Sequence, residues 1–126
     1  MKRLSPKAAW AISIPLALFF VAQGLLKLWG PASGHWAGRF AGWGYPHGSH
    51  YVVGAIEILG AITLLLPRIR LFGAGSLILV MAGAFCTHLV HREFPRTIPP
   101  LVLGFLAYLV LFSGRATRNS GTSRDQ

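Results

Sequence analysis

The sequence predicts an all-α membrane protein, a polytopic bundle of four transmembrane helices with a short interfacial helix in its first loop. The chain of 126 residues is 53% hydrophobic and only 12% charged, whereas soluble domains carry about 25% charged residues. Its apolar residues gather into four runs of the length that a helix needs to cross about 30 Å of hydrocarbon. We therefore expect a single membrane domain over residues 1–114.

The four predicted helices cover about residues 8–29, 50–66, 71–90 and 98–114. Gly30 and Pro31 follow the first run, Pro67 follows the second, and Pro99 lies in the first turn of the fourth. Proline is favoured in a first turn because the N–H group that it lacks would have no partner there. Pro15 lies inside the first run and predicts a mild kink.

The first loop is the longest, and it predicts a helix of its own. Trp36, Phe40 and Trp43 recur at i, i+4 and i+7, which places them on one helix face. Tryptophan and other amphipathic aromatic residues gather at the membrane–water interface. We expect this helix to anchor the protein on the outer membrane surface, and the alternative is that it caps a pocket in the bundle.

The net charge of +9 predicts the topology. Eight of the 12 Lys and Arg residues lie in the N-terminus, the second loop and the C-terminal segment, which share one side if four helices cross. Positive charge favours the cytoplasmic side, so we expect a multi-pass protein of the inner (cytoplasmic) membrane with both termini in the cytoplasm. Residues 115–126 are polar and predict a disordered cytoplasmic tail. This distribution favours the lipid bilayer as partner and argues against nucleic acid.

The N-terminus admits a second interpretation. A basic start followed by an apolar stretch that ends near Ala22 also resembles a secretory signal peptide. The apolar run continues to Trp29 and is longer than the apolar core of most signal peptides. We therefore favour an uncleaved helix.

Polar side chains from all four helices converge on the outer half of the predicted bundle. At a rise of 1.5 Å per residue, Lys27 and His88 lie roughly 3–5 Å deep, Gln23 and Glu57 about 10 Å, and Tyr108 about 15 Å. Small residues lie one turn away from most of them, so we expect these side chains to point into the bundle. These five are the candidate pocket residues, for binding a ligand or for handling protons.

Glu57 needs a partner if it is charged. A charged side chain at mid-membrane costs about 2.5–3.5 kcal/mol unless it is paired or hydrated. Lys27 can reach Glu57 along its stem, and Gln23 at the same depth can donate a hydrogen bond. Two alternatives remain open. Glu57 could stay neutral and handle protons, or the cluster of Lys27, Glu57 and Gln23 could serve only to fix the helix register.

Histidine and cysteine offer little further chemistry. His47 and His50, like His88 and His91, are spaced i and i+3, but no cysteine or carboxylate completes a ligand set, so we predict no metal site. The single cysteine, Cys86, excludes a disulfide within the chain and dithiol chemistry.

Four segments together resemble the DoxX-like family of small bacterial membrane proteins. They are GLLKLWG (24–30), FAGWGYP (40–46), GAIEILGAITLLLPR (54–68) and VMAGAFCTHL (80–89). The resemblance covers about residues 10–112, and its recurring polar positions include Lys27, Glu57 and His88. It implies a four-helix bundle in the cytoplasmic membrane.

The resemblance also implies two classes of function. Family members are linked to quinone-dependent oxidoreductases, as a small subunit of a thiosulfate:quinone oxidoreductase or as a partner in redox-protecting membrane complexes. Distant relatives are chaperones or cargo receptors. We therefore predict a subunit or partner of a quinone-linked membrane oxidoreductase, with quinone as its candidate ligand, and leave its catalytic residues unassigned. The alternative is a non-enzymatic assembly factor, and transport is weaker because the inner half offers no polar path.

Overall fold

The computed structural model describes residues 5–122, and the side chains as far as Phe112. This part of the chain is all-α. Its elements are α1 (Pro6–Leu28), α2 (Gly30–Gly42), α3 (Ser49–Leu64), α4 (Arg70–Val90), the 3-10 helix η1 (Phe94–Thr97) and α5 (Ile98–Thr122).

Local sequence sets the helix ends. The Ser5 hydroxyl caps α1 by accepting the Ala8 N–H at 3.2 Å, and a proline follows the cap. At the other end, Trp29 alone separates α1 from α2, with an extended backbone that turns the chain. Gly30 then takes a φ of 77°, a left-handed conformation that glycine adopts without strain.

The observed helices follow the predicted elements closely. The four apolar runs correspond to α1, α3, α4 and α5, and the helix expected in the first loop is α2. The last helix continues past residue 114 to Thr122, and so takes in most of the segment expected to be a disordered tail. Residues 123–126 of that tail lie outside the described residues.

Three helices are long and apolar enough to cross a membrane: α1, α4 and the segment Phe94–Phe112. The fourth predicted span, α3, is apolar but has only 16 residues. At 1.5 Å per residue it is about 24 Å long, shorter than the ~30 Å hydrocarbon core. Within the described residues, length and composition therefore establish three candidate spans where four were expected.

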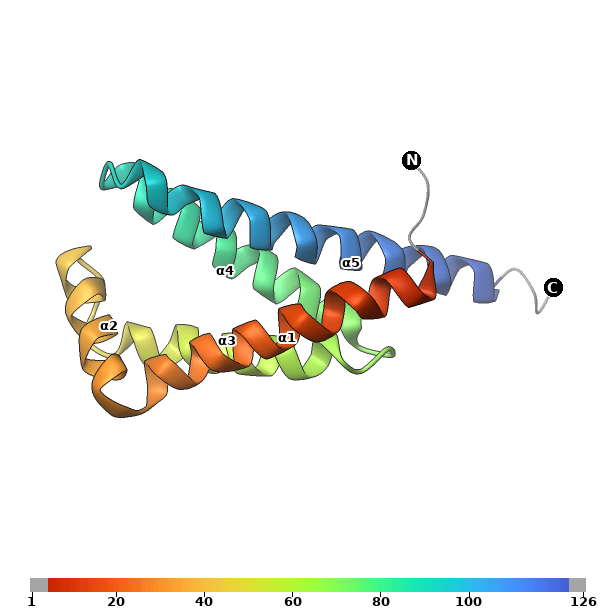
Figure 1. Ribbon diagram of the computed structural model, residues 1–126, viewed down its shortest axis with the longest axis horizontal. Helices are drawn as coiled ribbons and strands as arrows, with labels where there is room; N and C mark the ends of the chain where they lie inside the picture. Colours follow the sequence, from red (N-terminus) through yellow and green to blue (C-terminus); the bar gives the residue numbers. More distant parts are fainter. Residues whose placement is uncertain (1–4, 123–126) are drawn as a thin grey trace.

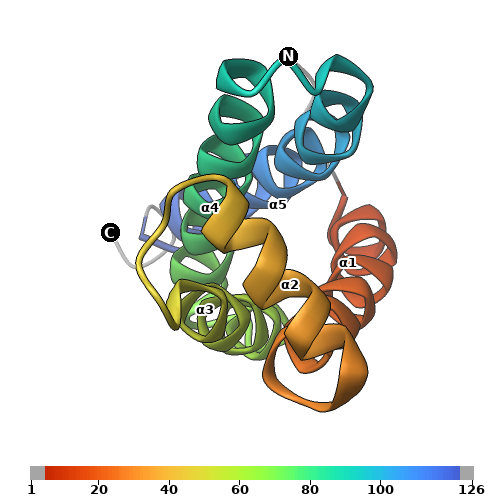
Figure 2. The same cartoon turned by 90° about the vertical axis from the view of Figure 1, so that its left-hand side faces the viewer.

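The helices form two pairs that diverge toward one end. α1 packs mainly on α3, α5 packs mainly on α4, and the α3–α4 contact joins the pairs. α2 lies across the end where the pairs diverge (Figures 1 and 2). The beginning of α1, the end of α5 and the α3–α4 connection all lie toward the opposite end (Figure 1).

The hydrophobic core lies where the two pairs meet, and its outer surface is also apolar. The core side chains are Leu16, Ala17, Phe20, Ala61, Leu64, Ala74, Leu77, Met81, Ala107 and Val110. Large apolar side chains such as Leu18, Leu59 and Leu79 are more than half exposed on the outside. Such a surface is expected of a protein that faces lipid.

Candidate functional site

A cavity of about 510 Å³ lies between the two helix pairs at the end covered by α2. We call it the polar cavity. Its lining includes Phe19, Phe20, Gln23 and Lys27 from α1, Trp36, Arg39, Phe40, Trp43 and Tyr45 from α2 and the loop after it, Glu57 from α3, Met81, Thr87 and His88 from α4, and Arg96 and Leu103 beyond α4.

A buried ion pair forms part of the cavity wall. Lys27 Nζ lies 2.9 Å from Glu57 Oε1, and the two side chains are only 7% and 3% exposed. The predicted contact between these two residues is thus confirmed. Gln23 lines the same cavity, but no hydrogen bond from it to Glu57 is found among the described residues.

Two glycines bring the pair together. Gly24 of α1 faces Gly54 of α3, and a Cβ added at Gly24 would lie only 2.7 Å from the Gly54 carbonyl oxygen. A Cβ at Gly54 would lie 2.9 Å from Lys27 Cβ. Because both residues lack a side chain, the two backbones approach closely enough for Lys27 to reach across to Glu57.

α2 is fixed to the same corner of the bundle. The Ser33 hydroxyl donates a 2.7 Å hydrogen bond to the Lys27 carbonyl, and its oxygen lies 3.4 Å from Nε2 of the buried His50. The Lys27 ammonium lies 4.2 Å from the centroid of the Trp36 ring, a cation–π contact. These contacts connect α1, α2 and α3 around the ion pair.

The aromatic stripe of α2 faces the cavity. Trp36, Phe40 and Trp43, which we call the aromatic roof, all line the cavity. The capping alternative therefore describes the position of the stripe, and the anchoring of α2 at the membrane surface stays a prediction. Periodicity predicts which residues share a face, but it does not say what that face packs against.

A basic side chain sits within this roof. The Arg39 guanidinium lies 4.9 Å from the Trp36 ring and 5.0 Å from the Trp43 ring. Partial burial lowers the pKa of Arg39, and the nearby Arg96 lowers it further, while Glu93 acts in the opposite direction. A guanidinium nevertheless stays charged in proteins, so Arg39 places a positive charge at the cavity.

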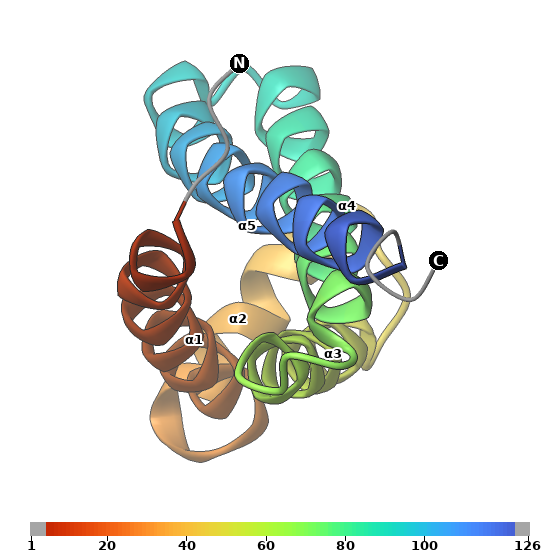
Figure 3. The ribbon, with the colours of Figure 1, turned by 90° about the vertical axis from the view of Figure 1, so that its right-hand side faces the viewer.

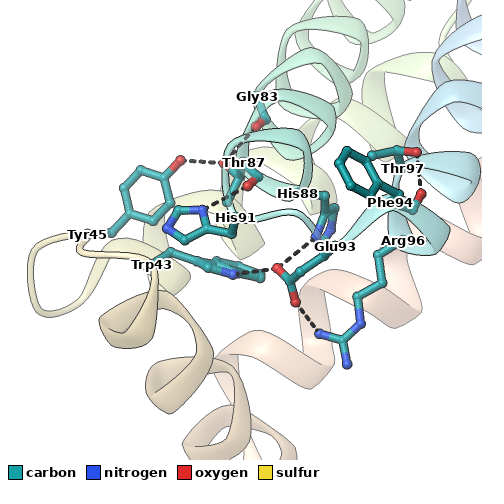
Figure 4. Close-up of polar contacts among 10 residues, drawn as sticks. All are labelled: Trp43, Tyr45, Gly83, Thr87, His88, His91, Glu93, Phe94, Arg96 and Thr97. Carbon is teal, nitrogen blue, oxygen red and sulfur yellow. Dashed lines mark hydrogen bonds and ion pairs between the residues drawn. The ribbon is translucent and has the colours of Figure 1, made fainter.

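A cluster of polar contacts joins the end of α2 to the connection between α4 and α5 (Figure 4). We call it the rim cluster, and its members are Trp43, His88, Glu93 and Arg96. Glu93 accepts hydrogen bonds from Trp43 Nε1 at 2.8 Å and from Arg96 Nη1 at 2.6 Å, and His88 Nδ1 lies 3.4 Å from the same carboxylate. The Trp43 hydrogen bond is the main cause that holds the pKa of Glu93 below its ordinary value, with His88 and Arg96 adding to it against a partial desolvation.

The loop after α2 is attached to α4. The Tyr45 hydroxyl lies 2.5 Å from Thr87 Oγ1, and Thr87 donates to the Gly83 carbonyl at 2.7 Å, so Tyr45 is the donor toward Thr87 (Figure 4). His91 Nδ1 donates to the Thr87 carbonyl at 2.8 Å. The roof is therefore held over the cavity from both ends.

Four of the five predicted pocket residues line the polar cavity: Gln23, Lys27, Glu57 and His88. Tyr108 does not line it, and its side chain is 45% exposed on α5. Counting along the helix gives depth but not direction. α5 turns Ala107 and Val110 to the core, which leaves Tyr108 on the outward face.

The rim cluster was missed from the sequence. Trp43 and Glu93 are 50 residues apart, and nothing in their local patterns pairs them. One signal was available, since Glu93 is one of only three acidic residues in the chain. Among the described residues, no group of three or more His, Cys, Asp or Glu side chains is placed to hold a metal ion.

The cavity combines three kinds of wall. Lys27 and Glu57 form a polar wall, the aromatic roof provides aromatic rings, and Phe19 and Leu103 form an apolar wall. A planar ring with polar substituents suits such a site, because aromatic side chains stack on rings and the polar groups orient them. Glu57 and His88 are titratable groups that can carry protons.

A comparison with known protein families gives a match. A family model, that of the DoxX-like family, matches residues 11–110, which is most of the chain. No curated protein and no solved structure matches the chain significantly.

Proposed function

Because the chain belongs to the DoxX-like family, we propose that it is a small membrane subunit, or a partner, of a quinone-linked membrane oxidoreductase. In this proposal the polar cavity binds the quinone head group. The protein lies in the cytoplasmic membrane with α1, α3, α4 and α5 crossing it, both termini in the cytoplasm and the cavity in the outer half.

The observation that carries the proposal is the Lys27–Glu57 pair, buried yet in contact with a cavity. The cavity volume of about 510 Å³ falls within the 300–1,000 Å³ that is usual for small-molecule sites. An ammonium group has three donors, and Glu57 occupies one of them. Lys27 can therefore also donate to a quinone carbonyl, while the roof stacks on the ring.

The site also suits the proton balance of quinone chemistry. Reduction of a quinone to its hydroquinone takes up two electrons and two protons, one proton on each carbonyl oxygen. Glu57 and His88 both line the cavity and can pass protons to those oxygens. In this proposal the electrons come from the partner subunit, which holds the redox centre.

Co-purification tests the proposal. A C-terminally tagged chain is extracted from its native membrane in mild detergent, and the co-purified proteins and quinone are identified by mass spectrometry. We expect a stoichiometric redox subunit and bound quinone with the wild type and with Tyr108→Phe, which alters a residue outside the cavity. Glu57→Gln keeps a side-chain oxygen that can accept from the Lys27 ammonium and should remain folded, yet it should lose quinone reduction because an amide does not pass protons. Undiminished quinone reduction in the Gln variant would contradict the proposal.

The second candidate function is a non-enzymatic assembly factor. The observation that favours it is the close Gly24–Gly54 contact, which places the ion pair at a helix crossing, where buried polar groups can fix how helices pack. In that case Glu57→Ala lowers the abundance of the protein rather than turnover, and a changing set of membrane proteins co-purifies. A stable, abundant Ala variant without function argues against this candidate.

A further inference from the structure

An apolar groove of about 360 Å³ lies between α1 and α5. Its walls include Ile12, Pro15, Leu16 and Phe19 from α1, and Leu103 and Leu106 from α5. Phe19 and Leu103 also line the polar cavity, so the groove and the cavity share these two side chains. The groove is therefore the neighbour of the cavity, and Phe19 and Leu103 stand between the two spaces.

The seam between α1 and α5 is less tightly joined than the helix pairs. α1 packs mainly on α3 and α5 mainly on α4, and the contact between α1 and α5 is smaller than either. The end view in Figure 3 shows α1 beside α3 and α5 beside α4. Among the described residues, no hydrogen bond or ion pair connects side chains of α1 and α5. In the part of the seam that the structure describes, the contacts are apolar, and neighbouring lipid can replace them at little cost.

Phe19 stands where the groove meets the cavity. Its side chain is 43% exposed, while the neighbouring Phe20 is fully buried, and the two rings meet edge to face at 5.7 Å. Because Phe19 is partly exposed, its ring has room to turn while Phe20 stays packed in the core. By contrast, hydrogen bonds to Glu93 and Thr87 attach the roof side of the cavity to α4 and its connection.

We propose that the quinone enters from the bilayer through the seam between α1 and α5, and that its isoprenoid tail then lies in the apolar groove. This inference rests on the proposed function. A membrane quinone is the ligand that fits both spaces, since it joins a neutral polar ring to a long apolar chain. Glu57 neutralises Lys27 and would repel a phosphate, but Arg39 also lines the cavity and can attract one. A phospholipid is therefore the competing occupant that the labelling experiment below separates from the quinone.

The isoprenoid tail should add little to the affinity of the protein for the quinone. It leaves one apolar environment, the bilayer, for another, the groove, so its transfer gains little hydrophobic free energy. Filling the groove should therefore exclude a long-chain quinone by steric overlap. A ring without a chain needs no room in the groove, so its equilibrium binding in the cavity should change little.

The test compares two probes in lipid nanodiscs. They are 2,3-dimethoxy-5-methyl-1,4-benzoquinone and the same ring with a decyl chain, and binding is counted above empty nanodiscs with radiolabelled compound. Leu106→Trp fills the groove at a residue that does not line the cavity. Val102→Trp, on α5 and lining neither space, is the matched control. We expect Leu106→Trp to weaken decyl-probe binding at least about tenfold and to change ring-probe binding less than about twofold.

The outcomes separate the two proposals. Equal binding of the decyl probe by Leu106→Trp and Val102→Trp shows that the tail does not lie in the groove, which overturns this inference and leaves the proposed function standing. Absence of both probes from the wild-type protein overturns the proposed function and this inference with it.

Photolabelling of the wild-type protein keeps the inference testable if Leu106→Trp fails to fold. A decyl probe with a diazirine at the end of its chain should label residues 11–19 of α1 and 103–106 of α5, and unlabelled decyl probe should compete. Labelling spread over other lipid-facing positions contradicts the inference. Labelling of the groove by a diazirine phosphatidylcholine that the decyl probe does not displace assigns the groove to ordinary lipid and also overturns it.

Discussion

The Lys27 ammonium and the Glu57 carboxylate depend on each other, because both are almost wholly removed from solvent. Burying one charge alone is strongly unfavourable, whereas a buried pair and an apolar pair of similar size can be nearly equal in stability. The difference between single and double substitutions therefore reports on the pair itself.

Removing only one member of this pair should be more damaging than removing both. Lys27→Met leaves the Glu57 carboxylate buried without a partner, and we expect it to lower the free energy of unfolding by about 3–5 kcal/mol. The double variant Lys27→Met/Glu57→Leu should recover most of that loss. Denaturant titration in mixed micelles measures both. Equal losses in the single and double variants would show that the pair carries no coupling.

The Glu93 carboxylate should show its hydrogen bonds in its titration. The Trp43 indole stabilises the charged form, so the pKa of folded Glu93 lies below the ordinary value of 4.5. Its contribution to stability is therefore complete above about pH 4.5, and is lost as the pH falls through the lower folded pKa. Trp43→Phe removes the donor and should raise the pKa of Glu93 toward 4.5.

NMR can follow this carboxylate directly, because the chain contains only two glutamates, Glu57 and Glu93. Carboxyl ¹³C labelling of glutamate then gives two signals, which Glu57→Gln assigns. Trp29→Phe is the matched control, since Trp29 is 73% exposed and its side chain makes no hydrogen bond with the described residues. A Glu93 titration that is the same in wild type, Trp43→Phe and Trp29→Phe would refute the role given to the Trp43 hydrogen bond.

At this scale, the sequence identified the buried pair but not the rim cluster. Lys27 and Glu57 could be found because a charge in an apolar helix requires a partner, and helix rise places the two at reachable depths. Tyr108 was wrongly included since depth says nothing about direction. Glu93 lies in a short connection, where neither depth nor periodicity applies, so its contact with Trp43 depends on how the whole bundle folds.

At the scale of the helices, close contacts at glycine decide how α3 meets its neighbours. Gly24 and Gly54 meet where α1 crosses α3, and Gly60 and Gly73 meet where α3 crosses α4. Without a Cβ on either side, backbones can approach far enough for polar side chains to reach across. α3 therefore stays fixed between α1 and α4 although it is the shortest of the apolar helices.

Alanine at two of these positions should loosen the bundle. A Cβ at Gly24 would lie 2.5 Å from Ile58 Cγ1 and 2.7 Å from the Gly54 carbonyl, and a Cβ at Gly73 would overlap Thr63 and the Gly60 carbonyl. We expect Gly24→Ala and Gly73→Ala each to lower the free energy of unfolding by about 1–3 kcal/mol. Thermal unfolding in detergent, followed by circular dichroism, measures the effect.

Gly75 is the matched control, because it lies in α4 with nothing within 4 Å of an added Cβ. Gly75→Ala should be neutral or stabilising by up to about 1 kcal/mol, since alanine is the better helix former. Equal destabilisation by Gly73→Ala and Gly75→Ala would show that the backbone approach at Gly73 is not the cause.

Helix positions were largely predictable, since apolar runs and prolines mark them in the sequence. The direction of the α2 stripe was not, because a row of Trp and Phe suits a lipid interface and a protein cavity equally well. Contacts from α4 and its connection, through Thr87 and Glu93, turn α2 inward.

At the scale of the whole molecule, the arrangement places α2 at one end and the beginning of α1 at the other (Figure 1). Eight of the 12 basic residues fall on the side of the termini if four helices cross, and positive charge is retained in the cytoplasm. Together these predict that α2 and the polar cavity face the outside of the cytoplasmic membrane.

Cysteine labelling checks this orientation. In a Cys86→Ser background, a cysteine is introduced by Gly38→Cys in α2 or by Ser5→Cys before α1, both at exposed positions. An impermeant maleimide should label the Gly38→Cys variant in intact spheroplasts, and the Ser5→Cys variant only after lysis. The Cys86→Ser protein itself is the control and should remain unlabelled. The reverse pattern would place the polar cavity on the cytoplasmic side.

The same variants also test whether α1 is cleaved. Loss of the Ser5→Cys label together with a shortened intact mass would show that α1 is cleaved as a signal peptide. Since cleavage near Ala22 would remove most of the helix that packs on α3, a cleaved chain could not keep the cavity described above.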